Sequence, residues 1–482
     1  MPYEPVIGLE VHAQLRTDSK IFCRCSTKFG GAPNSQVCPI CLGMPGVLPV
    51  LNQRAVEFAL RMGLATNCRI ANRSLFARKN YFYPDLPKGY QISQYEEPLC
   101  VGGYVEMEID GEVRHIGLTR IHLEEDAGKS VHTESYVSGN ETLVDVNRCG
   151  VPLIEIVSEP DIRSPREAAL YVSQLRQMVQ YHDICDGNME EGSLRCDANV
   201  SVRPIGSKVL GVKTELKNMN SIRGVEKALE FEIARQIRML DEGGEIVQQT
   251  LLWDADRNEA VPMRSKEYAH DYRYFPEPDL VPVMVSENWL NEIKGSLPEL
   301  PLERKQRLIR QYNIPVYDAE VLTGALALAD YFEETAKSSS DAKAASNWVM
   351  GEVLRVIKDS DSDIENFAVK PTELGLLIKL INKGTISGKI AKAVFEEMLQ
   401  TGQTAEAIIK AKGLLQISDS SEIQSIVADV LKNNPSEVEK YLAGKEQVLG
   451  FLVGQVMKAT GGKANPKLVN EIFRAELSRL KK

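Results

Sequence analysis

The chain has 482 residues, 43% of them hydrophobic, and its 57 Lys and Arg stand against 67 Asp and Glu, a formal net charge of −10. This balance argues against wholesale electrostatic binding of nucleic acid, although it leaves room for a local basic patch. No apolar run is long enough to cross a membrane, and the first residues lack the basic and apolar regions of a signal peptide. The composition predicts a soluble, cytoplasmic protein with several hydrophobic cores.

The first predicted strand has two different faces. From Ile7 to Leu15 the odd-numbered residues are apolar, whereas the even-numbered positions carry Glu10, His12 and Gln14. Because side chains alternate across a strand, one face is expected to pack and the other to carry chemistry-capable groups. A solvated antiparallel sheet would give the same pattern in any single strand.

Four cysteines follow this strand in two pairs, and they are Cys23, Cys25, Cys38 and Cys41. Glycine, proline and asparagine between the pairs allow the loop to bring them together around one tetrahedral zinc ion. Two disulfides or free buried thiols are the alternatives, but disulfides seldom persist in the cytosol. Since all four ligands would be protein atoms, we expect a structural zinc knuckle.

The loop Arg78–Gln91 is dense in cations and aromatic residues. Such a loop can hold phosphates and stack a base, or its aromatic residues can belong to a core.

Acidic residues occur at further predicted strands. Residues 118–123 alternate and run into Glu124–Lys129, and the apolar strand 152–157 contains Glu155. A carboxylate inside an apolar run needs a partner, which could be Arg148, Lys79 or a hard divalent cation.

The segment 194–203 repeats the alternation of the first strand, with Arg195, Asp197 and Asn199 on its polar face, and residues 213–217 repeat it again. A merely solvated face is usually filled with Thr, Lys and Glu. The His, Asp, Asn, Arg and Glu found here are able to bind metals and transfer protons. Helices predicted from Ser164 to about Tyr181, and from Asn220–Ser221 to about Gly243, would serve as the scaffold.

After about residue 290 the apolar residues recur with helical spacing, and a helical run ends near Lys412–Gly413. We therefore expect three domains, which span residues 1–290, 291–412 and 413–482. The last is modestly basic, and its lysines are Lys445, Lys458, Lys463 and Lys467. On residues alone these lysines are typical of an ordinary solvated helix face.

No phosphate-binding glycine loop, dinucleotide-binding turn or His-Glu-x-x-His helix occurs in the sequence. The residues alone thus predict a zinc-stabilised, metal-dependent enzyme that acts on a phosphorylated or carboxylated substrate, and they leave the reaction open.

Five segments in order resemble the B subunit family of the tRNA-dependent amidotransferases (GatB), and the resemblance covers essentially the whole chain. The segments are Val6–His12, Arg78–Asp85, Glu124–Lys129, Asn188–Asp197 and Asp271–Asp279. The resemblance implies an α+β fold, in which a cradle-shaped catalytic domain with an antiparallel sheet precedes two all-α domains, the last of which meets tRNA. It permits the zinc knuckle without requiring it.

The resemblance also implies a reaction. An ATP-dependent carbon–nitrogen ligase, built as a heterotrimer with an amidase (A) subunit and a small C subunit, would act on misacylated Glu-tRNA(Gln) or Asp-tRNA(Asn). The cradle would bind ATP and magnesium and phosphorylate the side-chain carboxylate, and ammonia channelled from the amidase would displace the phosphate. Phosphorylation supplies a good leaving group, and magnesium neutralises charge during the transfer.

By their places in the matching motifs, several side chains are implied as catalytic groups and magnesium ligands. The first choices are Glu10, His12 and Glu125, followed by Asp197 and Glu155. Lys79 is expected to steady phosphate oxygens as a point charge, or only to pair with Glu155, and Tyr81 is expected at the nucleotide.

Two other classes of protein stay open on the sequence. One is a metal-dependent hydrolase or nuclease that uses Glu10, His12, Glu125 and Asp197, and the other is a zinc-containing tRNA-binding scaffold. ATP consumption that depends on aminoacyl-tRNA separates the amidotransferase from both.

Overall fold

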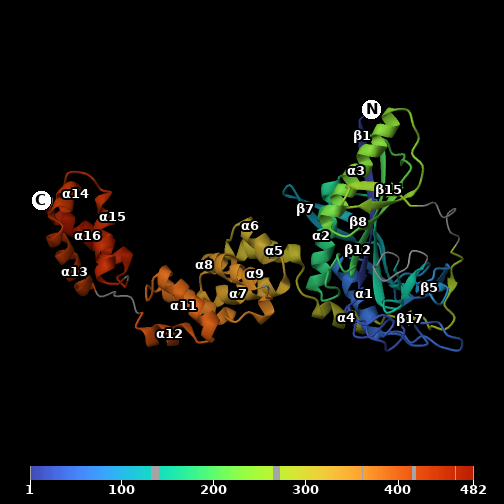
Figure 1. The fold of residues 1–482 in the computed structure, drawn as a ribbon, viewed down its shortest axis with the longest axis horizontal. Coiled ribbons are helices and arrows are strands. Elements are labelled where there is room, and N and C mark those ends of the chain that lie inside the picture. The colour runs from blue at the N-terminus through green and yellow to red at the C-terminus, as the bar shows by residue number, and fades with distance from the viewer. Residues whose placement is uncertain are drawn as a thin grey trace. The chain divides into compact units, whose positions relative to one another are not determined.

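The computed structural model describes residues 2–131, 141–263, 272–360, 362–414, 420–461 and 463–480. Asp271, the first residue of the fifth motif, lies outside the described residues. The chain divides into two compact units, Met1–Glu303 and Arg304–Lys482 (Figure 1). Sheet dominates the first unit and helices form the second, which confirms the α+β class. Among the described helices, none combines the length and apolar character needed to cross a membrane.

The first unit is built on a ten-stranded sheet of order β15-β14-β13-β12-β1-β11-β8-β6-β2, with β7 paired to β8. Its strands are β1 (Tyr3–Gln14), β2 (Arg69–Ile70), β6 (Cys100–Val101), β7 (Tyr104–Ile109), β8 (Glu112–Glu125), β11 (Pro152–Ser158), β12 (Leu194–Pro204), β13 (Thr214–Met219), β14 (Thr250–Asp254) and β15 (Glu259–Pro262). Strands β13 and β14 run parallel, whereas the other described neighbours pair antiparallel.

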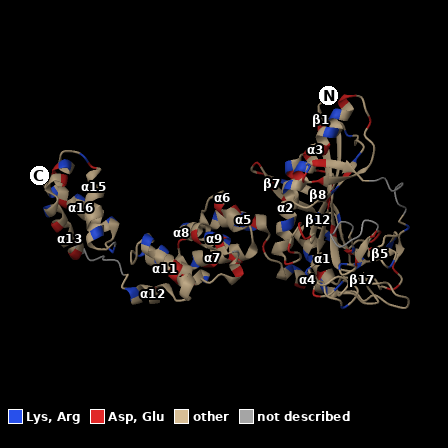
Figure 2. Ribbon diagram, in the orientation of Figure 1, with Lys and Arg blue, Asp and Glu red and all other residues tan. Residues whose placement is uncertain are grey.

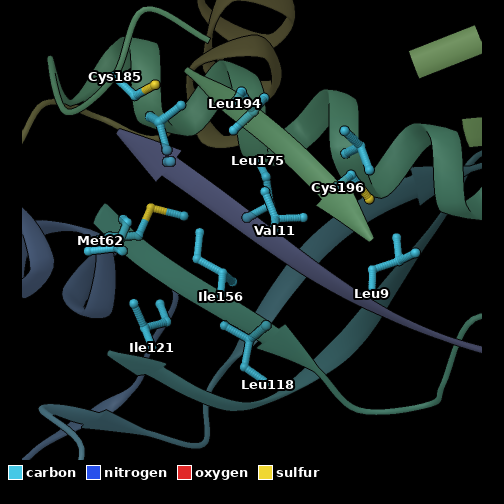
Figure 3. Packing of buried hydrophobic residues seen from close by; sticks show 14 of the residues in the cluster. Leu9, Val11, Met62, Leu118, Ile121, Ile156, Leu175, Cys185, Leu194 and Cys196 are labelled. Atoms are coloured by element: carbon cyan, nitrogen blue, oxygen red, sulfur yellow. The ribbon is translucent and has the colours of Figure 1, made fainter. Parts of the chain in front are cut away.

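Helices cover one face of this sheet, and they are α1 (Gln53–Ala65), α2 (Pro165–Tyr181) and α3 (Ile222–Asp241). The apolar positions of the strands point into the core between the two layers. Figure 3 shows Val11, Ile156 and Ile121 from three neighbouring strands beside Met62 of α1 and Leu175 of α2. The predicted alternation is thus confirmed over residues 7–14 of β1 and 194–200 of β12, where the residues of the opposite parity are only partly buried.

Three small sheets complete the first unit. They are β9 (Lys129–Val131) with β10 (Leu143–Asp145), β16 (Phe275–Pro276) with β4 (Ala77–Asn80) and β5 (Tyr90–Ser93), and β17 (Val283–Met284) with β3 (Arg73–Ser74). Helix α4 (Glu287–Ser296) follows, and its buried Ile293 belongs to the same core as the main sheet.

The second unit is helical, and α5 (Pro301–Tyr312) leads into it. Its further helices are α6 (Val316–Leu322), α7 (Leu326–Ser339), α8 (Ala342–Trp348), the π-helix Val349–Val353, α9 (Leu354–Ser360), the 3₁₀ turn Ile364–Asn366, α10 (Pro371–Asn382), α11 (Gly388–Thr401), α12 (Ala405–Lys412), α13 (Ser420–Asn433), α14 (Pro435–Leu442), α15 (Val448–Ala459) and α16 (Pro466–Leu480). Buried side chains from 308 to 409 form one apolar cluster, and those from 423 to 477 form another. Figure 2 shows Lys and Arg interspersed with Asp and Glu along these helices.

Candidate functional site

A row of polar side chains crosses the centre of the main sheet on the face opposite the helices. The strand register sets His12 of β1 opposite Arg195 of β12 on one side and Glu155 of β11 on the other. Glu155 is in turn opposite His122 of β8. Since directly opposed residues in antiparallel strands lie close together, this register brings groups far apart in sequence into one line.

Three of the side chains near the middle of this row converge. His12 Nε2 lies 3.4 Å from Glu155 Oε2 and 3.6 Å from Glu124 Oε1. The potential ligand atoms of the three residues all lie within 4.8 Å of one another. His122 Nε2 lies 3.5 Å from the same Glu155 oxygen. We call His12, Glu124 and Glu155 the sheet triad; its two carboxylates supply the hard oxygen ligands that magnesium prefers, and His12 adds a nitrogen.

The electrostatics of the sheet triad are those of a buried, tightly paired group. Burial lowers the pKa of His12, but its hydrogen bond to Glu155 and the charges of Glu124 and Glu155 outweigh burial and raise that pKa to about 9. Burial, together with the charge of Glu155, raises the pKa of Glu124 to about 7. Burial also acts to raise the pKa of Glu155, but the two histidines hold it well below its usual range. Such strongly perturbed groups cluster at functional sites.

Glu10 and Asp197 lie one step along the sheet from the triad and face each other across β1 and β12. Glu10 accepts a hydrogen bond of 3.0 Å from Asn199 Nδ2, and burial raises the pKa of Glu10. Asp197 is ion-paired with Lys217 of β13 at 2.7 Å. The structure therefore brings Glu10, His12 and Glu155 onto one face, with Asp197 at its margin beside a lysine.

Glu125, which the resemblance implied as a magnesium ligand, points the other way from its neighbour Glu124. Its carboxylate accepts hydrogen bonds from Lys88 Nζ and from the backbone N–H of Ile92. The carboxylate beside His12 is that of Glu124. The alternation of β8 could have predicted this difference from the sequence. Ile121, Leu123 and Glu125 are on the face that packs against the core, whereas His122 and Glu124 are on the polar face.

The partners of Glu155 also differ from the expected ones. In the part of the chain that the structure describes, Glu155 pairs with the two histidines, and no ion pair within 4.0 Å joins it to Arg148 or Lys79. Arg148 donates instead to the backbone carbonyls of Ala127 and Gly128 and lies 3.5 Å from Asp126. His122 was not singled out in the sequence, because a lone histidine in an alternating strand carries little information without its neighbours.

The cationic and aromatic loop comes together with the fifth motif. Strand β4 pairs with β16, and the Arg78 guanidinium forms two hydrogen bonds of 2.7 and 2.9 Å with Glu277. Lys79 Nζ lies 4.8 Å from the ring centre of Tyr272 and 5.9 Å from that of Tyr81. Lys79 thus sits among aromatic rings, where a cation is stabilised by the ring faces.

A cavity of about 760 Å³ adjoins the polar face. It is lined by the fourth motif, from Met189 to Asp197, by Gln14 of β1 and by the segment 27–31 of the cysteine loop. Four of its lining residues are cationic, and they are Lys28, Lys129, Arg148 and Arg195. Four acidic residues line it as well, and they are Asp145, Glu190, Glu191 and Asp197. The hollow is large enough for a small ligand, and its cations are able to contact phosphate oxygens.

The four N-terminal cysteines are brought together as their spacing predicted. The Sγ atom of Cys41 lies 3.4, 3.7 and 3.6 Å from the Sγ atoms of Cys23, Cys25 and Cys38. Tetrahedral zinc–thiolate bonds of about 2.3 Å place sulfurs about 3.8 Å apart, so the donor set fits zinc. A hydrogen bond from Cys23, with a contribution from the charge of Lys20, lowers the pKa of Cys41 to about 4. The five other cysteines of the chain are buried.

Comparisons with known proteins find similarity along nearly the whole chain. A family model described as the GatB/GatE catalytic domain matches residues 5–291, and one described as the GatB domain matches residues 330–477. The B subunit of the aspartyl/glutamyl-tRNA(Asn/Gln) amidotransferase of Thermodesulfovibrio yellowstonii is 61% identical over 473 residues, which cover 98% of this chain and 99% of that protein. The proteins of the same name from Carboxydothermus hydrogenoformans and Geobacter sulfurreducens are each 58% identical, over 99% of this chain and 99% and 100% of their own lengths.

Proposed function

The chain belongs to the family of the B subunit of the tRNA-dependent amidotransferases, and from this membership we propose that it is the carboxylate-activating subunit of such an enzyme. Its substrates would be Glu-tRNA(Gln), Asp-tRNA(Asn) or both, and the products the matching Gln-tRNA(Gln) and Asn-tRNA(Asn). The chemistry is that of an ATP-dependent ligase, in which the side-chain carboxylate takes the γ-phosphoryl group of ATP and ammonia then displaces phosphate.

The observation that carries this proposal is the sheet triad with Glu10 beside it. Phosphoryl transfer to a carboxylate brings several negative charges together, and bound magnesium would supply the positive charge that stabilises them. We propose that Glu124, Glu155 and His12 hold that ion, with Glu10 as a further oxygen donor. Binding the ion would displace the proton that His12, with a pKa of about 9, holds in the metal-free site. Asp197 and Glu125 were candidates for the same set, but each already has a lysine partner, Lys217 or Lys88.

The groups around the triad fit the handling of a nucleotide. Arg195, Lys129 and Arg148 line the cavity, and we propose that they contact phosphate oxygens of the nucleotide. Lys79 would steady the transferred group, and Tyr81 beside it would pack against the nucleotide or the acyl group. Both roles rest on the place of these residues in the second motif, Arg78–Asp85, and on the pairing of its strand β4 with β16 of the fifth motif.

We further propose that the protein works in the cytoplasm in a heterotrimer with an amidase (A) subunit, which releases ammonia from glutamine, and a small C subunit. The relatives are each named as the B subunit of an enzyme, and hence as one component of a complex. The cysteine quartet would hold a structural zinc ion, because all four ligand positions are filled by protein sulfurs.

ADP formation tests this proposal. The chain, co-purified with its amidase partner, should convert ATP to ADP when misacylated Glu-tRNA(Gln) or Asp-tRNA(Asn) is added and not without it. His12→Ala should abolish that ADP, whereas His115→Ala, which removes an exposed histidine of β8, should leave it unchanged. If ADP forms equally without tRNA, or equally in His12→Ala, the result would contradict this proposal and favour the hydrolase or scaffold hypothesis.

A further inference from the structure

A lysine lies fully buried beside the cysteine quartet. The side chain of Lys20 has 0% exposure. Its Nζ donates a hydrogen bond of 2.8 Å to the backbone carbonyl of Gln36 and lies 3.5 Å from Cys41 Sγ, as a donor to that sulfur. Across the described residues, no carboxylate lies within 4.0 Å of this ammonium group, whereas the less deeply buried cations Arg78, Lys88 and Arg203 are each paired with one.

A buried ammonium without a counter-ion is strongly unfavourable, so the fold is expected to supply a negative charge close to it. A zinc ion with four thiolates carries a net charge of −2, and Cys41 is the one quartet sulfur that touches Lys20. The charge of the lysine and the excess charge of a metal–thiolate centre are thus complementary. Each would be costly to bury without the other.

We propose that Lys20 is the built-in counter-ion of the tetrathiolate zinc centre, a positioning residue that raises its metal affinity by donating a charged hydrogen bond to the Cys41 thiolate. Partners that hydrogen-bond to metal ligands fix their orientation and tune the metal. This inference rests on the zinc site put forward under the proposed function.

The same lysine connects the metal centre to the wall of the cavity. The carbonyl that accepts from Lys20 belongs to Gln36, whose backbone N–H donates a hydrogen bond of 2.8 Å to Asn147 Oδ1. Gln36 and Asn147 both line the cavity. Cys41, Lys20 and Gln36 therefore form one continuous chain of contacts, through which a zinc ion bound by the quartet would hold that wall in place.

The test compares zinc affinity and a cobalt spectrum in the full chain with its partner subunits. Lys20→Met removes the charge and keeps the apolar stem, and Lys20→Gln removes the charge but keeps a donor. The control is Asn34→Gly, which loses the two side-chain hydrogen bonds of Asn34 to the backbone of Val144 and Val146 without touching a sulfur. Glycine suits that site because Asn34 has a φ of 58°.

Chelator competition should show zinc binding weakened about 10- to 100-fold in Lys20→Met, and less in Lys20→Gln, with Asn34→Gly near the natural protein. With cobalt in the site, the thiolate-to-metal charge-transfer band should move to lower energy in Lys20→Met, because a thiolate that loses its hydrogen bond is a stronger electron donor. Asn34→Gly should leave the band in place.

Unchanged affinity and an unchanged band in Lys20→Met would overturn the inference, as would an equal loss of affinity in Asn34→Gly. If Lys20→Met does not fold, Lys20→Gln is compared with Lys20→Arg, which keeps the charge. Weaker zinc binding in Lys20→Gln than in Lys20→Arg would support the inference, and equal binding would overturn it. A natural protein that binds neither zinc nor cobalt through thiolates would instead refute the zinc site itself.

Discussion

At the scale of single residues, two adjacent carboxylates of β8 have different surroundings. Glu124 lies beside His12 on the polar face, whereas Glu125 forms a buried pair with Lys88, the two side chains being 2% and 7% exposed. A buried ion pair is costly to form, and removing only one partner leaves an uncompensated charge. We therefore expect Glu125 and Lys88 to act as a unit in stability.

Replacing only one residue of the Glu125–Lys88 pair should strongly destabilise the protein. Glu125→Gln alone or Lys88→Met alone should each lower the free energy of unfolding of the first unit by about 3–5 kcal/mol, since each leaves the other group buried and unpaired. The double variant should cost clearly less than the sum of the two single variants. Denaturant unfolding of all three proteins measures this, and strict additivity would show that the two groups are not coupled.

His182 gives the protein an acid-sensitive position. It caps the C-terminal end of α2, is 1% exposed, and its two ring nitrogens have no hydrogen-bond partner. Burial, helped by the charge of Arg61, lowers its pKa to about 4. The unfolded chain, in which the pKa is about 6.5, therefore binds the proton more tightly than the folded protein does.

The neutral histidine consequently contributes stability that is fully present above pH 6.5 and is lost as the pH falls towards 4. The loss attributable to this residue should reach about 3 kcal/mol. His182→Leu should flatten the stability profile between pH 6.5 and 4 by that amount, and His115→Leu, at an exposed position, should not. Parallel profiles for His182→Leu and the natural protein would contradict this prediction.

At the scale of elements, the sequence predicted helix α2 closely because its start is encoded locally. Ser164 Oγ accepts a hydrogen bond of 3.1 Å from the Glu167 N–H, and Pro165 occupies the first turn. Strands β1 and β12 were predicted equally well, since strict alternation needs no knowledge of the partner strand.

The contacts between elements could not be predicted in this way. Arg78 pairs with Glu277, which is 199 positions away in the sequence. Lys88 pairs with Glu125 of β8, and no local sequence pattern indicates that these two segments lie together. Strand parity therefore singled out Glu10 and His12, and Glu155 stood out as a carboxylate inside an apolar run. Parity along β8 separates Glu124 from Glu125, but only the register of β8 against β11 shows which side chains of β8 lie beside Glu155.

The cap of α2 supports a direct measurement. Ser164→Ala removes the acceptor for a backbone N–H at the helix start and should lower the free energy of unfolding by about 1 kcal/mol. Ser173→Ala, at an exposed position in the middle of the same helix, should be neutral or slightly stabilising, because alanine is the better helix former there. Equal effects of the two substitutions would show that the cap bond contributes nothing.

At the scale of the whole molecule, the sheet gathers motifs that are scattered over some 270 residues. The first, third and fourth motifs meet through β1, β8 and β12, and the second and fifth through β4 and β16. Two hydrogen bonds join these two sets of motifs. The backbone N–H of Gly128 donates to the carbonyl of Asp85, and Gln91 Nε2 donates to the carbonyl of Glu125. The five segments thus lie in one region of the first unit, which is why a resemblance that spans all of them carries more functional information than any one motif.

The lysines of the last helical cluster bear on tRNA binding. If Lys445, Lys458, Lys463 and Lys467 contact phosphates, replacing all four by alanine should weaken binding and reduce the slope of log affinity against log salt by about four. The control Lys432→Ala changes an exposed lysine of α13. Titrations of tRNA at several salt concentrations give the slopes, and an unchanged slope in the quadruple variant would identify these lysines as an ordinary solvated face.

The central claim is that the sheet triad directs phosphorylation of the tRNA-bound carboxylate, and an oxygen-18 transfer experiment tests it most directly. Misacylated Glu-tRNA(Gln) labelled in both side-chain carboxylate oxygens is converted by the complete enzyme, and the released phosphate is analysed by mass spectrometry. We predict one labelled oxygen in each phosphate and the other in the new amide, with both products lost in Glu124→Gln and kept in Glu106→Gln. Amide formation with unlabelled phosphate, or undiminished transfer in Glu124→Gln, would contradict the claim.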